Sequence, residues 1–265
     1  MSAHCARLSR RQRADTCRRA VLPLHAKSGI APGNLRRPLT ARKCELFSAC
    51  FSQRYRALRI RELIMAAGAT VGTNDSGIRL ALHAKRLRRL TACPETLIID
   101  ELGLAHSRSR IDVAVINGSI HGYEIKSARD TLDRLSMQID IYRKALQKVT
   151  IVAATRHVTQ VEKMTPEWCG VIEAQQGPRG GITFRDLRKA YFSPDTDPLV
   201  LSHLLWRDEA VEILADLGYE SKELRKPRKQ LYEMLCANLS AQEITASIRT
   251  SMAKRQTWRD HPVHG

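Results

Sequence analysis

The stretch that decides the fold is Ile111–Lys126, which reads IDVAVINGSIHGYEIK. Two runs rich in β-branched residues, Ile111–Ile116 and Ile120–Lys126, are separated by Asn117-Gly118-Ser119. Asn-Gly between apolar runs is a strong short-range signal for a β-hairpin. We therefore expect two antiparallel strands joined by a tight turn.

The length of that turn decides which side chains share a face of the sheet. With a two-residue loop, Asp112 would lie opposite Tyr123, and Glu124 would point to the other side of the sheet. A three-residue loop with glycine in the left-handed conformation restores the parity, so that Asp112, Glu124 and Lys126 share one face. A site built from these three residues therefore predicts a three-residue loop or a bulge.

Helical and strand patterns flank the hairpin on both sides. From Leu132 to Leu146 apolar residues recur at steps of three and four, which is typical of an amphipathic helix. Val149–Ala154 is a short β-branched run typical of a buried strand. A helical stripe precedes the hairpin from Ile78 to Leu90, and Ile182–Phe184 is a weaker strand signal. The expected fold class is α/β, a mixed β-sheet flanked by helices.

The last third of the chain has the pattern of a helical region. Leu199–Leu217 is strongly apolar and stops at Gly218, a natural position for a helix C-cap. Pro227 can open a further helix. Ser240 and Glu243 form a capping-box pattern that predicts one more helix.

Positive charge is concentrated in the N-terminal part of the chain. The formal net charge is +17, and 14 of the 44 Lys and Arg residues lie in residues 1–60 beside only two acids. We expect three parts: a basic extension and linker over 1–72, an α/β core over 73–195 and a helical region over 196–258. A basic balance favours nucleic acid as partner.

Composition excludes several other classes of protein. No run of about 18 apolar residues exists, so no membrane partner is expected. The aromatic content of 5% argues against a base-stacking platform. The seven cysteines form no CxxC pair, which favours reduced thiols and a cytoplasmic protein. The sequence leaves the oligomeric state open.

Four ionisable residues in and near the hairpin could carry chemistry: Glu101, Asp112, Glu124 and Lys126. Two carboxylates and a main-chain carbonyl are hard oxygen ligands that suit Mg²⁺. Such a metal polarises a phosphate and lowers the pKa of a bound water, while a nearby lysine meets developing charge. The alternative is that either carboxylate simply pairs with Lys126 or Arg110 on a solvated sheet face.

The order of these residues resembles the PD-(D/E)XK nuclease superfamily, over about Leu97–Thr155. The resemblance implies a restriction-endonuclease-like fold. It also implies that Asp112 and Glu124 bind Mg²⁺, with Mn²⁺ as a substitute, that the carbonyl of Ile125 is a further metal ligand, and that Lys126 assists the water. Glu101 would match the helix-borne acid of that superfamily.

Gln138 and Tyr142 match the Gln-x-x-x-Tyr feature of the RecB-like branch of that superfamily, and their spacing places both on one helix face. Tyr142 also belongs to the apolar stripe of its helix, so plain core packing is an equal alternative. The chain departs from the named motif at Ile111, where proline stands in the pattern.

Residues 78–258 further resemble a bacterial protein family of this nuclease-like type. The resemblance implies a Mg²⁺-dependent nuclease acting on DNA. The alternative function is a catalytically inactive nucleic-acid-binding or regulatory protein on the same fold, and a third is an interaction protein whose polar cluster is structural. Outside the site, the basic stretch 223–229 is the best candidate for phosphate contacts.

Overall fold

The computed structural model describes residues 73–260 of the 265, with side chains up to residue 255. The expected basic extension over 1–72 lies outside the described residues. The division of the rest into an α/β core and a helical region stays a prediction from the sequence.

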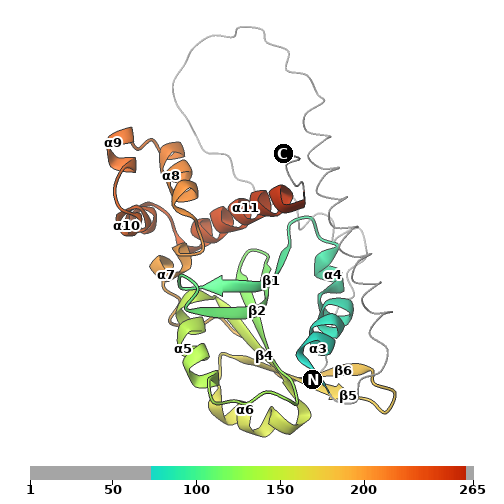
Figure 1. The fold of residues 1–265 in the computed structure, drawn as a ribbon. Coiled ribbons are helices and arrows are strands. Elements are labelled where there is room, and N and C mark those ends of the chain that lie inside the picture. Colours follow the sequence, from blue (N-terminus) through green and yellow to red (C-terminus); the bar gives the residue numbers. More distant parts are fainter. Residues whose placement is uncertain (1–72, 261–265) are drawn as a thin grey trace, which may run out of the picture. The chain divides into compact units, whose positions relative to one another are not determined.

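A six-stranded mixed sheet forms the middle of the described structure, with its strands in the order of the sequence (Figure 1). The strands β3, β4 and β5 run parallel to one another, and the other neighbours pair antiparallel. The strands are β1 (Leu97–Leu104), β2 (Ser109–Ile116), β3 (Ile120–Lys126), β4 (Lys148–Ala154), β5 (Gly170–Gln176) and β6 (Ile182–Arg188).

The hairpin between β2 and β3 has the predicted three-residue loop. Ile116 pairs with Ile120, which leaves Asn117, Gly118 and Ser119 between the strands. Gly118 has φ 66°, the left-handed conformation that glycine adopts without a steric penalty. The register continues to Val113 opposite Tyr123, so Asp112 and Glu124 follow at the next position.

Helices cover both faces of the sheet, which confirms the predicted α/β class of mixed sheet with flanking helices (Figure 1). The helices α5 and α6 lie on one face and the helices α3 to α4 on the other. The helical segments are α3 (Asp75–Ala81), the π-helix η2 (Leu82–Leu87), α4 (Arg88–Thr91), α5 (Leu135–Ala145), the 3-10 helix η3 (Thr155–His157), α6 (Val158–Met164), α7 (Pro198–Ser202), α8 (Arg207–Asp216), α9 (Ser221–Leu224), α10 (Arg228–Asn238) and α11 (Ala241–Asp260). Among the described helices, none is long and apolar enough to cross a membrane.

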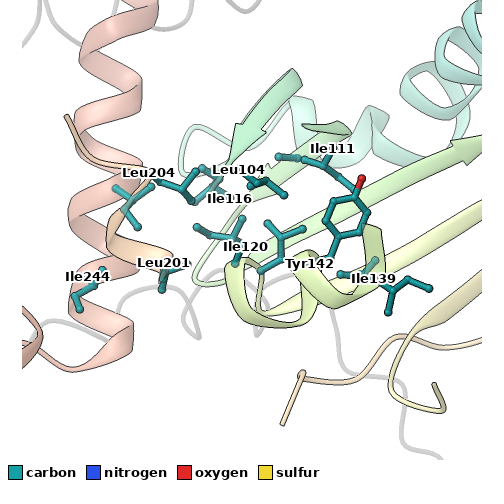
Figure 2. Close-up of a cluster of buried hydrophobic side chains, with 14 of the residues drawn as sticks. Leu104, Ile111, Ile116, Ile120, Ile139, Tyr142, Leu201, Leu204 and Ile244 are labelled. Atoms are coloured by element: carbon teal, nitrogen blue, oxygen red, sulfur yellow. The ribbon is translucent and has the colours of Figure 1, made fainter. Parts of the chain in front are cut away.

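The larger hydrophobic core lies between the sheet and α5 and continues into the C-terminal helices (Figure 2). Tyr142 of α5 is fully buried there, and Leu201 of α7 and Ile244 of α11 belong to the same cluster. Gly122 allows β3 to pack closely against Leu146, which directly follows α5. A Cβ at position 122 would lie 2.6 Å from a methyl carbon of Leu146.

The C-terminal helices lie where the sequence signals predict them, except that one predicted apolar helix is divided into two. The apolar stretch 199–217 forms two helices, because Trp206 is extended and its backbone N–H donates to Glu209 at 2.7 Å at the start of α8. The second helix ends before Gly218, which has φ 91°. The predicted capping box is present, since Ser240 N–H donates to Glu243 at 2.8 Å.

Candidate functional site

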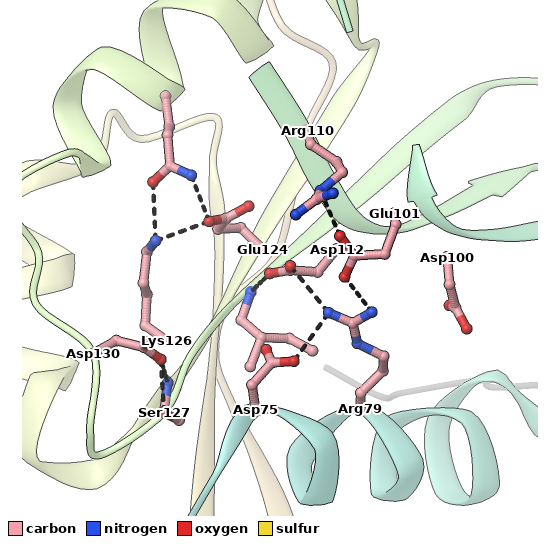
Figure 3. A network of polar contacts seen from close by, with 12 residues as sticks. Asp75, Arg79, Asp100, Glu101, Arg110, Asp112, Glu124, Lys126, Ser127 and Asp130 are labelled. Atoms are coloured by element: carbon pink, nitrogen blue, oxygen red, sulfur yellow. Dashed lines mark hydrogen bonds and ion pairs between the residues drawn. The ribbon is translucent and has the colours of Figure 1, made fainter. Parts of the chain in front are cut away.

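Glu124 and Lys126 stand at alternate positions of β3, so both point toward α5 (Figure 3). Lys126 Nζ donates to Glu124 Oε1 at 2.8 Å and to Gln138 Oε1 at 2.9 Å. Gln138 Nε2 donates to Glu124 Oε1 at 2.7 Å, and the hydroxyl of Tyr142 lies 2.7 Å from Glu124 Oε2. We call these four residues the α5-side cluster. The structure brings together Glu124, Lys126 and the two helix residues that the sequence singled out.

The two charges of the buried α5-side cluster neutralise each other. Only 3% of Glu124 and 7% of Lys126 is exposed, and an unpaired charge at such depth is costly. The two opposite charges meet directly, so each is compensated by the other. Burial raises the pKa of Tyr142, and the negative charge of Glu124 raises it further. Tyr142 therefore keeps its proton, and its hydroxyl can donate a hydrogen bond to the carboxylate of Glu124.

A second network lies on the other side of the sheet, around Arg79 of α3 (Figure 3). The guanidinium lies 3.0 Å from Asp75 and 3.2 Å from Asp112, and it forms an ion pair with Glu101. Glu101 also pairs with Arg110 at 2.5 Å. We call these five residues the α3-side cluster. It joins α3 to β1 and β2.

Asp112 stands between the two clusters. Its Oδ2 accepts the backbone N–H of Ile125 at 2.6 Å, just beyond the last backbone pair of β2 and β3. The side chain thus replaces the main-chain acceptor where the two strands separate. Burial raises the pKa of Asp112 to about 7, with the charge of Glu124 as the next cause in the same direction. The hydrogen bond from Ile125 and the charge of Arg79 act against that rise.

The predicted single face is therefore only partly present. Glu124 and Lys126 take their partners from α5, whereas Asp112 reaches Arg79 on α3. The expectation failed because β2 and β3 stop pairing at Val113. The β1–β2 ladder also lacks a pair at Asp112, opposite the kinked Glu101, so regular alternation no longer fixes where the Asp112 carboxylate points.

Glu101 is not on a helix, which corrects the expectation taken from the nuclease resemblance. It lies within β1 at φ 56°, a left-handed conformation that is strained for a residue with a side chain. This kink lets two successive acids reach the same helix layer: Asp100 hydrogen-bonds His83 at 2.8 Å, and Glu101 pairs with Arg79.

Arg79 is the residue that sequence reasoning missed. Its side chain is 19% exposed and contacts three carboxylates. One signal was present in the sequence: Asp75 and Arg79 stand four residues apart, although the helical stripe was predicted to begin only at Ile78. A second signal was the charge imbalance of the predicted site, because three acids had a single lysine to compensate them.

The donors present do not suit a resident Mg²⁺ in this arrangement. Both oxygens of Glu124 and both oxygens of Asp112 already accept hydrogen bonds from the protein. Within residues 73–260, no group of three or more His, Cys, Asp or Glu side chains is placed to hold a metal ion. Metal ligation by Asp112, Glu124 and the Ile125 carbonyl, and the catalytic roles of the six site residues, stay predictions from the sequence.

Asp112 gives the stability of the protein a specific pH dependence. Its pKa is higher in the folded chain, at about 7, than the ordinary aspartate value of about 4. The folded state therefore binds the proton more tightly, and this residue stabilises the fold below about pH 4 and loses that contribution as the pH rises to about 7. We expect Asp112→Asn to flatten the pH dependence in this window. Denaturant unfolding of both proteins at pH 5 and pH 7.5 measures the change in the free energy of unfolding between the two pH values. An equal change in the wild type and in Asp112→Asn would refute the prediction.

Added Mg²⁺ should leave the stability unchanged, because a cation would have to displace Arg79 or Lys126 from its carboxylate. A ligand that binds only the folded state raises the melting temperature, so ~10 mM MgCl₂ or MnCl₂ is a direct probe. The control is NaCl at matched ionic strength. A metal-specific rise that disappears in Asp112→Asn would establish the predicted metal site.

Comparison with known proteins places the chain in a phage family. The family model of bacteriophage P4 protein cII matches residues 78–261. Protein cII of Enterobacteria phage P4 is 31% identical over 162 residues, which is 61% of this chain and 60% of that relative. The chain thus matches somewhat less than two thirds of the relative's length. No solved structure matches.

These matches overturn the assignment to the PD-(D/E)XK superfamily and the main reading as a Mg²⁺-dependent nuclease. The stretch matched is nearly the same as the one that suggested an uncharacterised bacterial nuclease-like family, but the family it identifies is a different one. The Glu-x-Lys spacing on which the nuclease resemblance rested is a short pattern, and here its two residues form a buried ion pair. The chain belongs to the family of bacteriophage P4 protein cII.

Proposed function

We propose that this protein is a DNA-binding regulatory protein that does not hydrolyse its nucleic acid. The proposal takes up the alternative function that the sequence left open. Its main support is an exposed basic segment, residues 222–229, which lies away from the two polar clusters. The finer assignment of the sheet as restriction-endonuclease-like stays a prediction from the sequence.

The basic segment covers α9, the turn after it and the start of α10. Five of its eight residues are basic: Lys222, Arg225, Lys226, Arg228 and Lys229. Glu223 lies 3.9 Å from Lys226, and Glu233, just beyond the segment, lies 3.8 Å from Lys229; five basic residues thus face two acids. Lys and Arg that are not neutralised by the protein are available for phosphate oxygens, which supply most of the non-specific affinity for DNA.

A packed scaffold holds this segment in place. Leu231, Tyr232 and Leu235 of α10 are buried in the main core, and the hydroxyl of Tyr232 donates to the carbonyl of Leu205 at 2.7 Å. The opposite side of α10 carries exposed Lys229. A rigid helix start with basic side chains can fix a protein on a duplex without ordering a long loop.

The polar clusters are then structural in this proposal. Lys126 donates to Glu124 and Gln138, so its positive charge is held by the protein itself. Arg79 likewise fastens α3 to the strands. Both arrangements hold helices to the sheet, and neither needs a substrate to be satisfied.

The test compares DNA retention by the full chain and by the double variant Arg225→Gln/Lys229→Gln. We expect the variant to bind a labelled 20-base-pair duplex more weakly, with a slope of log K against log salt that is shallower by about 1.8, because two phosphate contacts are lost. Fluorescence anisotropy at several salt concentrations measures both quantities.

Arg88→Gln/Arg89→Gln is the matched control, because it removes the same charge from exposed positions on α4. Equal losses in the variant and the control would contradict a defined contact segment. Absence of retention by the wild type at low salt would refute DNA binding. Cleavage of the duplex with Mg²⁺ that Asp112→Asn abolishes would refute the non-hydrolytic part.

A further inference from the structure

A cleft of about 650 Å³ separates β1 and the turn after it from the C-terminal helices. Its size falls within the range of small-molecule sites, about 300–1,000 Å³. One wall carries Asp100, Glu101 and His106, and the other carries His203, Trp206 and Arg228. The cleft shares Glu101 with the α3-side cluster and Arg228 with the basic segment, but its aromatic lining belongs to neither.

The turn beside the cleft is strained in a way that places His106. Ala105, His106 and Ser107 have φ values of 48°, 57° and 65°, which is three successive residues with side chains in the left-handed region. This conformation is strained for residues with side chains, and strain of this kind collects at functional sites. The result here is that the imidazole of His106 stacks on that of His203, with ring centroids 4.1 Å apart.

Aromatic and basic groups face the cleft together. Trp206 is 53% exposed, which is unusual for so large an apolar ring, and the guanidinium of Arg255 lies 4.1 Å from its centroid. Arg228 is exposed, and no ion pair to it is found among the described residues. Arg228 lines the same cleft as the stacked rings of His106 and His203.

The acidic wall does not cancel this character. Asp100 is hydrogen-bonded to His83, and Glu101 is paired with Arg79 and Arg110. The cleft thus offers one uncompensated cation, Arg228, beside flat aromatic rings.

We propose that this cleft binds a free mononucleotide, with the phosphate at Arg228 and the base against the exposed ring of Trp206 and the stacked histidines. A guanidinium forms bidentate hydrogen bonds with phosphate oxygens. Base–aromatic stacking supplies affinity that an inorganic anion lacks. The ligand would join β1 to the C-terminal helices, and this role goes beyond the proposed binding of DNA.

Titration of the full chain with AMP, GMP, CMP and UMP tests the proposal. Binding is monitored by tryptophan fluorescence and by calorimetry. We expect saturable binding of at least one nucleotide, with a fluorescence change that Trp206→Phe removes. Arg228→Gln should weaken binding at least about tenfold, because a charge-assisted contact is lost. Arg88→Gln, the same change at an exposed position on α4, should leave the affinity within about twofold.

Three results would overturn the proposal: no saturable binding of any nucleotide, equal affinity in Arg228→Gln, or binding of single-stranded DNA without binding of free nucleotides. Inorganic phosphate binding as tightly as the best nucleotide would overturn the part played by the rings. The two proposals fail separately, since DNA retention is tested with Arg225 and Lys229 and the cleft with Arg228 and Trp206.

Discussion

Two neighbouring carboxylates, the buried Glu124 and the half-buried Asp112, are the constraint on which the rest of the structure depends. Like charges at this depth repel, and each loses the water that would otherwise stabilise it. The protein gives each its own cation: Lys126 neutralises Glu124, and Arg79 lies against Asp112. Glu124 takes two further partners, Gln138 and Tyr142, from α5, and Arg79 comes from α3, so satisfying the carboxylates also fixes both helix layers to the sheet.

This division explains how residues with the pattern of a nuclease site can occur in a chain of the phage P4 cII family. A lysine two residues after a glutamate on a strand is suited to assist hydrolysis only while its charge is available. Here Lys126 is held by Glu124 and Gln138 in the core, and the contacts with other molecules proposed above lie on other surfaces. The basic segment 222–229 and the cleft beside Trp206 lie in the C-terminal helices, which share the larger hydrophobic core with the sheet.

Sequence patterns predicted the frame of this fold well, because they record local physics. The Asn-Gly turn set the loop at Gly118, and apolar periodicity located β2, β3, α5 and β4. The kink at Glu101 and the ion pairs of Arg79 were beyond reach, since both depend on contacts between segments far apart in the chain. The sequence alternative of a solvated pair was half right: Glu124 does pair with Lys126, but in the core, and Asp112 pairs with Arg79 and not with Arg110.

The central claim, that the buried carboxylate of Glu124 depends on Lys126 for its countercharge, is tested most directly by a double-mutant cycle in the free energy of unfolding. We predict that Lys126→Met lowers it by about 3–5 kcal/mol, because Glu124 is left buried without a cation, and that Glu124→Gln/Lys126→Met recovers most of the loss. Lys163→Met, at an exposed position, is the control and should change it by less than about 0.5 kcal/mol. A Lys126→Met protein as stable as the wild type or more so would contradict the account, since residues kept for chemistry commonly cost stability.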